Sequence, residues 1–122
     1  PRNPFRITGA QIDGSFALDN EIYLVEAKWQ KDPISEAPLL VFRGKVESRS
    51  NITRGVFISL SRCTTDALDA ISRGKQPNFF VIDGYELTLV LERRIDLKAM
   101  LRAKLRRLAE EGLVFVSARD LF

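Results

Sequence analysis

The chain has 122 residues, of which 45% are hydrophobic and 29% charged, a composition typical of one globular domain with a packed core. Its net charge of +3 favours an anionic partner only mildly. The chain contains no histidine, which excludes Ser-His-Asp and Cys-His catalysis, histidine zinc sites and histidine general bases. Any chemistry must therefore use carboxylates, lysine or hydroxyls, with or without a hard metal ion.

The single cysteine, Cys63, cannot form an internal disulfide, which predicts a reducing, cytoplasmic location. Without a histidine beside it, this thiol is a weak candidate for a nucleophile. No apolar run approaches the roughly 18 residues of a membrane span, and no signal peptide is visible, so no membrane partner is expected. Because the first residue is proline, we expect a domain taken from a longer protein that carries further domains.

The chain begins with a predicted β-hairpin. Residues 10–18 and 21–29 both alternate in the manner of strands, and Asp19-Asn20 supplies the turn between them. If these two residues form the whole loop, Leu18 faces Glu21, and the cross-strand partners of both arms follow from that pairing.

The remaining elements alternate between helices and strands. The sequence predicts a helix over 34–49 with Pro38 in its first turn, a buried strand over 55–60, a helix from Thr64 or Thr65 to about Gly74, and a second buried strand over 78–83. Two further helices are predicted over 84–92, with an Asp83/Glu86 capping box, and over 97–111, between Asp96 and Gly112; residues 113–116 form a last strand or a packed tail. This order predicts an α/β sandwich, a mixed β-sheet flanked by helices, in one domain over residues 1–122.

One face of the predicted hairpin is polar. The register places Asp13 opposite Glu26 and Gln11 opposite Lys28, whereas the other face is apolar and suits the core. Facing carboxylates repel, and a hard cation such as Mg²⁺ relieves this because it accepts oxygen ligands and is often held by one or two carboxylates. The backbone carbonyl of Ala27 is a further ligand candidate. The pattern predicts a phosphate-handling metal site; the alternative is a surface salt-bridge cluster.

These residues carry a resemblance to a known family. Asp13 followed by Glu26-Ala27-Lys28 resembles the PD-(D/E)xK nuclease signature. The segments "QIDG", "YLVEAKW", "FRGKVE", "RGVFISLS", "DALDAI" and "FFVIDGYEL" occur in the order and spacing of the Mrr-like restriction endonuclease domain, over about residues 7–92. The resemblance implies a restriction-endonuclease-like fold with its core over 7–92 and a C-terminal helical extension over 93–122.

The resemblance also implies an activity, the Mg²⁺-dependent hydrolysis of DNA phosphodiester bonds in restriction, defence or repair, with Mn²⁺ able to substitute. Asp13 and Glu26 would ligate the metal, and Lys28 would orient the attacking water or stabilise charge on the phosphate. Many such folds contribute another acidic residue from a helix before the hairpin, and we expect the chain to start after that helix. Two alternatives remain open, a catalytically silent binding or assembly module of this fold and a nuclease acting on RNA.

Four residues are candidates for contacting the nucleic acid: Gln11, Gln30, Arg43 and Lys45. Their alternative role is that of solvated surface residues. Double-strand cleavage would favour a homodimer. Outside the site, Trp29 is expected in the core, and Lys104, which falls in the apolar sector of helix 97–111, is expected to extend to the surface or lie at the edge of that sector.

Overall fold

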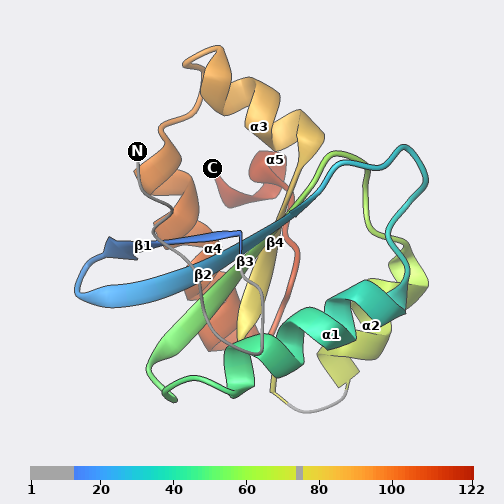
Figure 1. Cartoon of the computed structure of the whole chain (residues 1–122). Coiled ribbons are helices and arrows are strands. Elements are labelled where there is room, and N and C mark those ends of the chain that lie inside the picture. The colour runs from blue at the N-terminus through green and yellow to red at the C-terminus, as the bar shows by residue number, and fades with distance from the viewer. Residues whose placement is uncertain (1–12, 74–75) are drawn as a thin grey trace.

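A computed structural model of the chain describes residues 13–73 and 76–122. In this part of the chain, four strands form one mixed sheet in the order β1-β2-β3-β4 (Figure 1). β1 and β2 are antiparallel, and β3 and β4 continue the sheet parallel to β2. The strands span Gly14–Leu18 (β1), Glu21–Lys28 (β2), Thr53–Ser59 (β3) and Phe79–Asp83 (β4).

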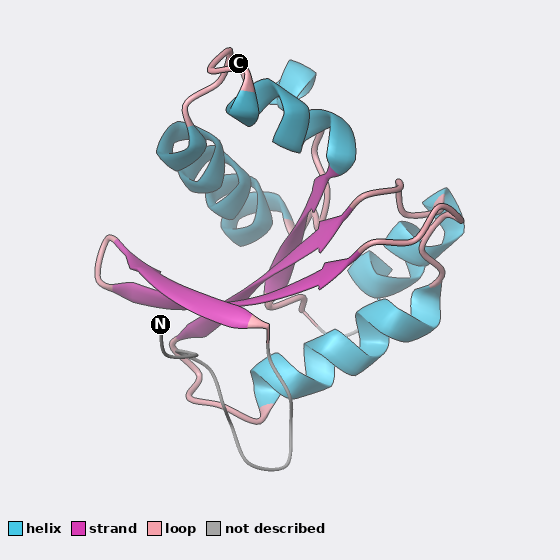
Figure 2. Cartoon of the chain, turned by 45° about the horizontal axis from the view of Figure 1, so that its top comes forward, coloured by secondary structure: helices cyan, strands magenta, loops and turns pink. Residues whose placement is uncertain are grey.

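Helices cover both faces of the sheet, as the sequence predicts for an α/β sandwich (Figure 2). α1 (Glu36–Glu47) and α2 (Thr65–Arg73) lie on one face. α3 (Gly84–Leu91), α4 (Leu97–Glu111) and α5 (Ala118–Leu121) lie at the other side. α4 packs directly on the sheet, since its Met100, Leu101 and Leu108 join the apolar cluster of that face. Among the described residues, no helix is both long and apolar enough to cross a bilayer.

The hairpin register is the one predicted. Asp19 and Asn20 both have positive φ, 53° and 68°, as a two-residue type I′ turn requires. Leu18 therefore pairs with Glu21, and Phe16 pairs with Tyr23, whose rings stack with centroids 5.0 Å apart. Residues 10–12 of the predicted first arm lie outside the described residues.

The expectation of one apolar and one polar hairpin face is wrong in part. Tyr23 is buried in the cluster on the α4 side, but Leu24, on the opposite face with Glu26, is buried in the cluster under α1 and α2. A strand that is central in a sheet covered on both faces needs apolar residues in both directions. The polar positions are therefore confined to the end of β2, where this apolar cover stops.

The helix boundaries follow the predicted capping signals. Asp83 and Glu86 form the capping box of α3, Asp96 accepts the Ala99 N–H at the start of α4, and Gly112 ends α4 with φ 70°. Thr64 Oγ1 accepts the Ala67 N–H at the start of α2. α1 is shorter than predicted, and Pro38 lies in its first turn.

Three features differ from the sequence-based picture or extend it. Trp29 is 65% exposed, because β2 ends at Lys28 and strand alternation no longer governs the next residue. Residues 113–116 are a packed tail rather than a strand; the carbonyl of Val114 accepts the Val81 N–H at 2.9 Å. The short helix α5 follows, and no capping bond from Ser117 marks its start.

Candidate active site

The candidate site lies at the start of β1 and the end of β2. The described pairing between these strands begins at Gly14 and Val25. Beyond Val25, Glu26 to Lys28 pair with β3, from Phe57 to Ser59. Among the described residues, Asp13, just before β1, contacts this end of β2 on the side that faces β1.

Asp13 is anchored to β2 through its carboxylate. Asp13 is an exposed residue, and its Oδ2 accepts a hydrogen bond from the backbone N–H of Ala27 at 2.8 Å. In an antiparallel pair, the N–H and C=O of one residue point to the same side of the strand. The Ala27 carbonyl therefore points to the side of β2 on which the Asp13 carboxylate lies.

Glu26 is buried, with 7% of the residue exposed. A buried carboxylate is costly unless it is paired, and here the ammonium of Lys45, on α1, lies 2.8 Å from Glu26 Oε1. Strand alternation puts Lys28 on the same face of the sheet as Glu26, and Lys28 is partly exposed. The end of β2 thus combines two acids and two lysines.

The sequence did not reveal the contact between Lys45 and Glu26. Lys45 was expected to contact nucleic acid, but it reaches this carboxylate because α1 crosses over the face of β2 that carries Leu24 and Glu26. The only signal in the sequence is the basic residue in the last turn of an amphipathic helix, which is common. Its partner is set by tertiary packing.

The other candidates for nucleic-acid contact are placed differently. Gln30 is exposed just beyond β2, and its Nε2 donates to the Asp32 carbonyl at 3.1 Å. Gln11 lies outside the described residues. Arg43 is buried, with 9% exposed, and its Nη2 donates to the Ile71 carbonyl at 2.8 Å. Arg43 thus ties α1 to the end of α2, and a guanidinium held inside cannot reach a DNA backbone. The expectation for Arg43 therefore needs correction.

The donors at the site suit a hard divalent cation. Within the described residues there is no group of three or more His, Cys, Asp or Glu side chains that could hold a metal. The donors available are the carboxylates of Asp13 and Glu26 and the Ala27 carbonyl, all oxygens. Mg²⁺ is commonly held by one or two carboxylates, with waters and phosphate oxygens completing its shell, so these residues fit that ion rather than an enclosed protein cage.

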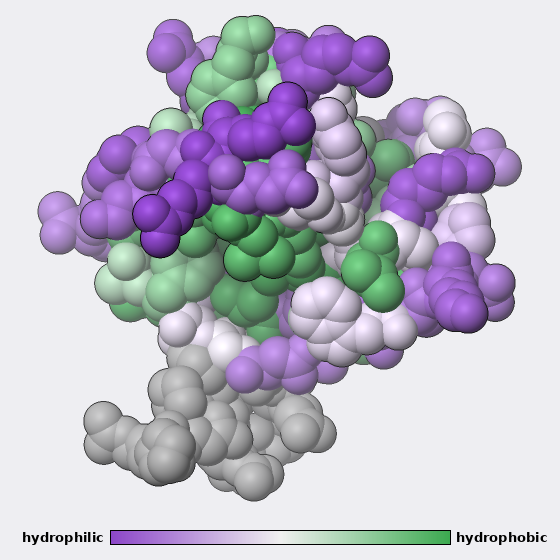
Figure 3. Space-filling model, turned by 90° about the horizontal axis from the view of Figure 1, so that it is seen from above, coloured by the Kyte–Doolittle hydropathy of each residue, from purple (hydrophilic) through white to green (hydrophobic). Residues whose placement is uncertain are grey.

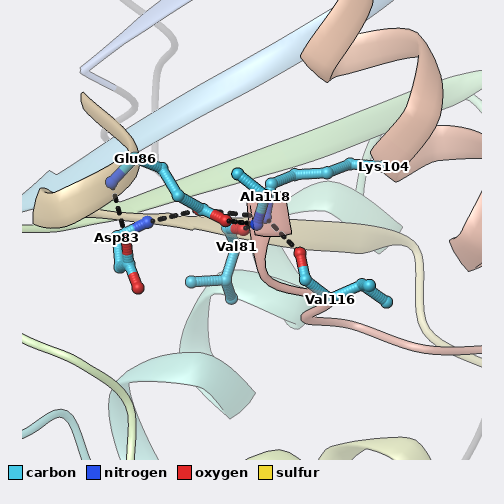
Figure 4. A network of polar contacts seen from close by, with 6 residues as sticks. All are labelled: Val81, Asp83, Glu86, Lys104, Val116 and Ala118. Atoms are coloured by element: carbon cyan, nitrogen blue, oxygen red, sulfur yellow. Dashed lines mark hydrogen bonds and ion pairs between the residues drawn. The ribbon is translucent and has the colours of Figure 1, made fainter. Parts of the chain in front are cut away.

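A second charged cluster lies away from this site, between β4, α3 and α4 (Figure 4). Glu86 and Lys104 are paired at 2.9 Å, and each side chain is 1% exposed. Lys104 also donates to the carbonyls of Val81 and Val116, and Glu86 also accepts the N–H groups of Asp83 and Ala118. The expectation that Lys104 reaches the surface is wrong, because Glu86 supplies a buried partner. With its donors and acceptors engaged and no solvent access, this cluster suits a structural role.

A surface hollow of about 430 Å³ lies between α3, α4 and α5. Figure 3, which looks down on the molecule from above, shows apolar surface bordered by polar side chains. Of the described residues that line the hollow, only Asp96 has a carboxylate side chain, and it already accepts the Ala99 N–H at the start of α4. The hollow therefore lacks the paired acids found at the end of β2. Its other lining residues include Tyr85, Leu89, Arg94, Ile95, Arg119 and Phe122.

Comparison with protein families places the chain beside a known family. The family model Mrr_cat, described as restriction endonuclease, matches residues 6–91. This range includes β1 to β4 with α1 to α3, and all the residues of the candidate site. The searches of curated proteins and of solved structures each return no match.

Proposed function

The chain belongs to the Mrr-type restriction endonuclease family and is a restriction-endonuclease-like nuclease domain, and from that premise we propose that it hydrolyses phosphodiester bonds of DNA at the end of β2. The observation that carries this proposal is the bond between Asp13 Oδ2 and the Ala27 N–H. It ties one carboxylate to the strand segment that carries Glu26 and Lys28.

The proposed roles of the acids follow from their positions. Asp13 and Glu26, with the Ala27 carbonyl, would hold Mg²⁺, for which Mn²⁺ would substitute. Such a cation would lower the pKa of a bound water and offset negative charge on the phosphate. Asp13 is fixed by its bond to β2, and Glu26 is fixed by Lys45, so neither acid has to be ordered when the substrate arrives.

Lys28 would act on the reacting phosphate. It follows Glu26 by two residues, so both side chains project from the same face of β2. Lys28 is partly exposed, as Lys45 is, but among the described residues no carboxylate forms an ion pair with Lys28, whereas Lys45 pairs with Glu26. An ammonium group in this position can orient the attacking water or stabilise the charge that develops on phosphate oxygens.

The biological setting belongs to the same proposal. We assign the domain to a cytoplasmic restriction, defence or repair protein in which further domains select the target. Among the described residues, Gln30 is the candidate for a contact to phosphate beside the site, because it is exposed just beyond β2. A homodimer would supply the two active sites that double-strand cleavage needs.

The test is cleavage of supercoiled plasmid DNA and of a structured RNA by the chain, with and without Mg²⁺. We expect nicking of the DNA that requires the cation and is abolished by Glu26→Gln, while DNA binding by that variant is retained. Cleavage of RNA alone would reassign the substrate. Binding of DNA by the unaltered chain with no cleavage in Mg²⁺ or Mn²⁺ would favour the silent-module alternative and contradict the proposal.

A further inference from the structure

Two lysines oppose two carboxylates at the end of β2. Asp13 and Glu26 bring two negative charges, and Lys28 and Lys45 bring two positive ones. Lys45 and Glu26 form an ion pair, in which Nζ of Lys45 lies 2.8 Å from Glu26 Oε1. Glu26 has a side chain only 9% exposed, whereas that of Lys45 is 24% exposed. Lys45 is therefore the more exposed member of this ion pair.

A purely structural role for this ion pair is the simplest alternative. The pair joins α1 to β2 and would then serve to hold the helix on the sheet. However, α1 is already fixed by Leu39, Phe42 and Val46, which are at most 1% exposed in the cluster beneath it. A single partly exposed ion pair adds little to apolar packing of that extent. The position of Lys45 therefore calls for another explanation.

We propose that Lys45 is a positioning residue of the cation site, which holds Glu26 by one oxygen and sets how tightly the site binds a divalent cation. This inference rests on the proposed function, because it takes Asp13 and Glu26 as the ligands. The ammonium of Lys45 and a divalent cation are attracted to the same carboxylate and repel each other. Repulsion between charges a few ångströms apart near a protein surface is large enough to change affinity by a factor of ten or more.

The charge balance gives the consequence. With both lysines present, the four side chains carry no net charge, so the protein alone has little electrostatic preference for a divalent cation. Without Lys45 the set carries one net negative charge, and Glu26 loses a competing partner for Oε1. Removal of Lys45 therefore tightens binding of the cation, although it also removes the bond that orients Glu26.

The experiment is calorimetric titration of the chain with Mn²⁺ at low ionic strength and without nucleic acid. Lys45→Met removes the charge but keeps most of the side chain, and Lys45→Gln is a second uncharged variant should the first not fold. Lys45→Arg keeps the charge. Lys98→Met is the matched control, because Lys98 is exposed on α4 and its charge acts on Asp19, in the turn at the opposite end of the hairpin from Glu26. Thermal unfolding followed by circular dichroism identifies the folded variants.

We expect Lys45→Met and Lys45→Gln to bind Mn²⁺ about tenfold more tightly than the unaltered chain. Lys45→Arg and Lys98→Met should stay within about twofold of it, since neither changes the charge beside Glu26. Addition of Glu26→Gln to Lys45→Met should abolish the gain. A merely structural ion pair would instead lower the melting temperature without tightening the binding of Mn²⁺.

The outcomes separate this inference from the proposed function. If Mn²⁺ binding is lost in Asp13→Asn but unchanged or weaker in the uncharged Lys45 variants, the inference about Lys45 is wrong and the proposed site stands. If the unaltered chain and all variants bind no Mn²⁺ and cleave no DNA, both are wrong.

Discussion

Glu86 and Lys104 form an ion pair in the interior, 2.9 Å apart, with 1% of each side chain exposed. Removing one partner leaves an uncompensated buried charge, so we expect Lys104→Met to reduce the free energy of unfolding by about 3–5 kcal/mol. Chemical denaturation monitored by circular dichroism measures this. The double variant Lys104→Met, Glu86→Leu should lose less than the sum of the two single losses. Additive losses would show that the two charges do not depend on each other.

The same variant should show a characteristic dependence on pH. Burial raises the pKa of Glu86 above its ordinary value, and the Lys104 ammonium works against that rise. Without Lys104 the pKa of Glu86 should rise further, so the folded state binds a proton at a higher pH than the unfolded state. The free energy of unfolding of Lys104→Met should therefore increase as pH falls from neutrality towards the ordinary carboxyl pKa. A loss of stability over that range, attributable to Glu86, would contradict this assignment.

Two glycines should respond in opposite directions to alanine. A Cβ at Gly84 would overlap the backbone carbonyl oxygen of Leu60, which cannot move without displacing the end of β3. At Gly44, in α1, a Cβ would meet no atom within 4 Å. We expect Gly84→Ala to destabilise the fold by about 1–3 kcal/mol or more and Gly44→Ala to stabilise it by about 0.5–1 kcal/mol. Thermal unfolding of the two variants checks both signs, and equal effects would contradict the packing described.

The thiol of Cys63 should be unreactive in the folded chain. Burial is the main cause that raises its pKa to about 11, and the negative charge of Asp83 adds to it. At mildly alkaline pH the thiolate fraction should therefore be about a hundredfold lower than for an ordinary cysteine. Alkylation by iodoacetamide should be slower by at least that factor than in the unfolded chain. Comparable rates in the two states would show that Cys63 is accessible.

The sequence predicts local structure well where short-range chemistry determines it. Asp19-Asn20 indicates the turn and hence the register, and Asp96 and Gly112 mark the ends of α4 because capping groups act within a few residues. Lys104 and Trp29 were misplaced for a different reason. The burial of Lys104 beside Glu86 and the exposure of Trp29 after the end of β2 both depend on how segments far apart in the chain pack together.

The same division holds for the candidate site: the positions set by the hairpin can be predicted from the sequence, and those set by the packing of α1 cannot. The register brings Asp13 level with Glu26, and strand alternation adds Lys28, so three residues follow from the hairpin alone. That Lys45 pairs with Glu26, and that Arg43 is buried against the Ile71 carbonyl, depends on how α1 lies across the sheet. The helical period places Arg43 on the buried face of α1 with Leu39 and Val46, and Lys45 beside that face, but it does not indicate the partner of either residue.

Mg²⁺ should stabilise the folded chain. A ligand that binds the folded state alone raises the melting temperature, and the proposed site exists only when β1 and β2 are paired. The rise should increase with the concentration of Mg²⁺ and be reduced in Asp13→Asn, which keeps the shape of the side chain but removes its charge. Asp66→Asn, at an exposed position in the first turn of α2, is the matched control and should respond as the unaltered chain does. An equal response in both variants would place the binding elsewhere.

The most direct test of the proposed active site is single-turnover cleavage of DNA by Lys28→Ala, with equilibrium binding measured at the same salt concentration and Lys98→Ala as control. Lys28 is assigned to the reacting phosphate, so we predict a fall in the cleavage rate of about a hundredfold or more. Affinity for DNA should change little, because many backbone contacts share the binding energy. Cleavage by Lys28→Ala at the rate of the unaltered chain would contradict the assignment of Asp13, Glu26 and Lys28 as the active site.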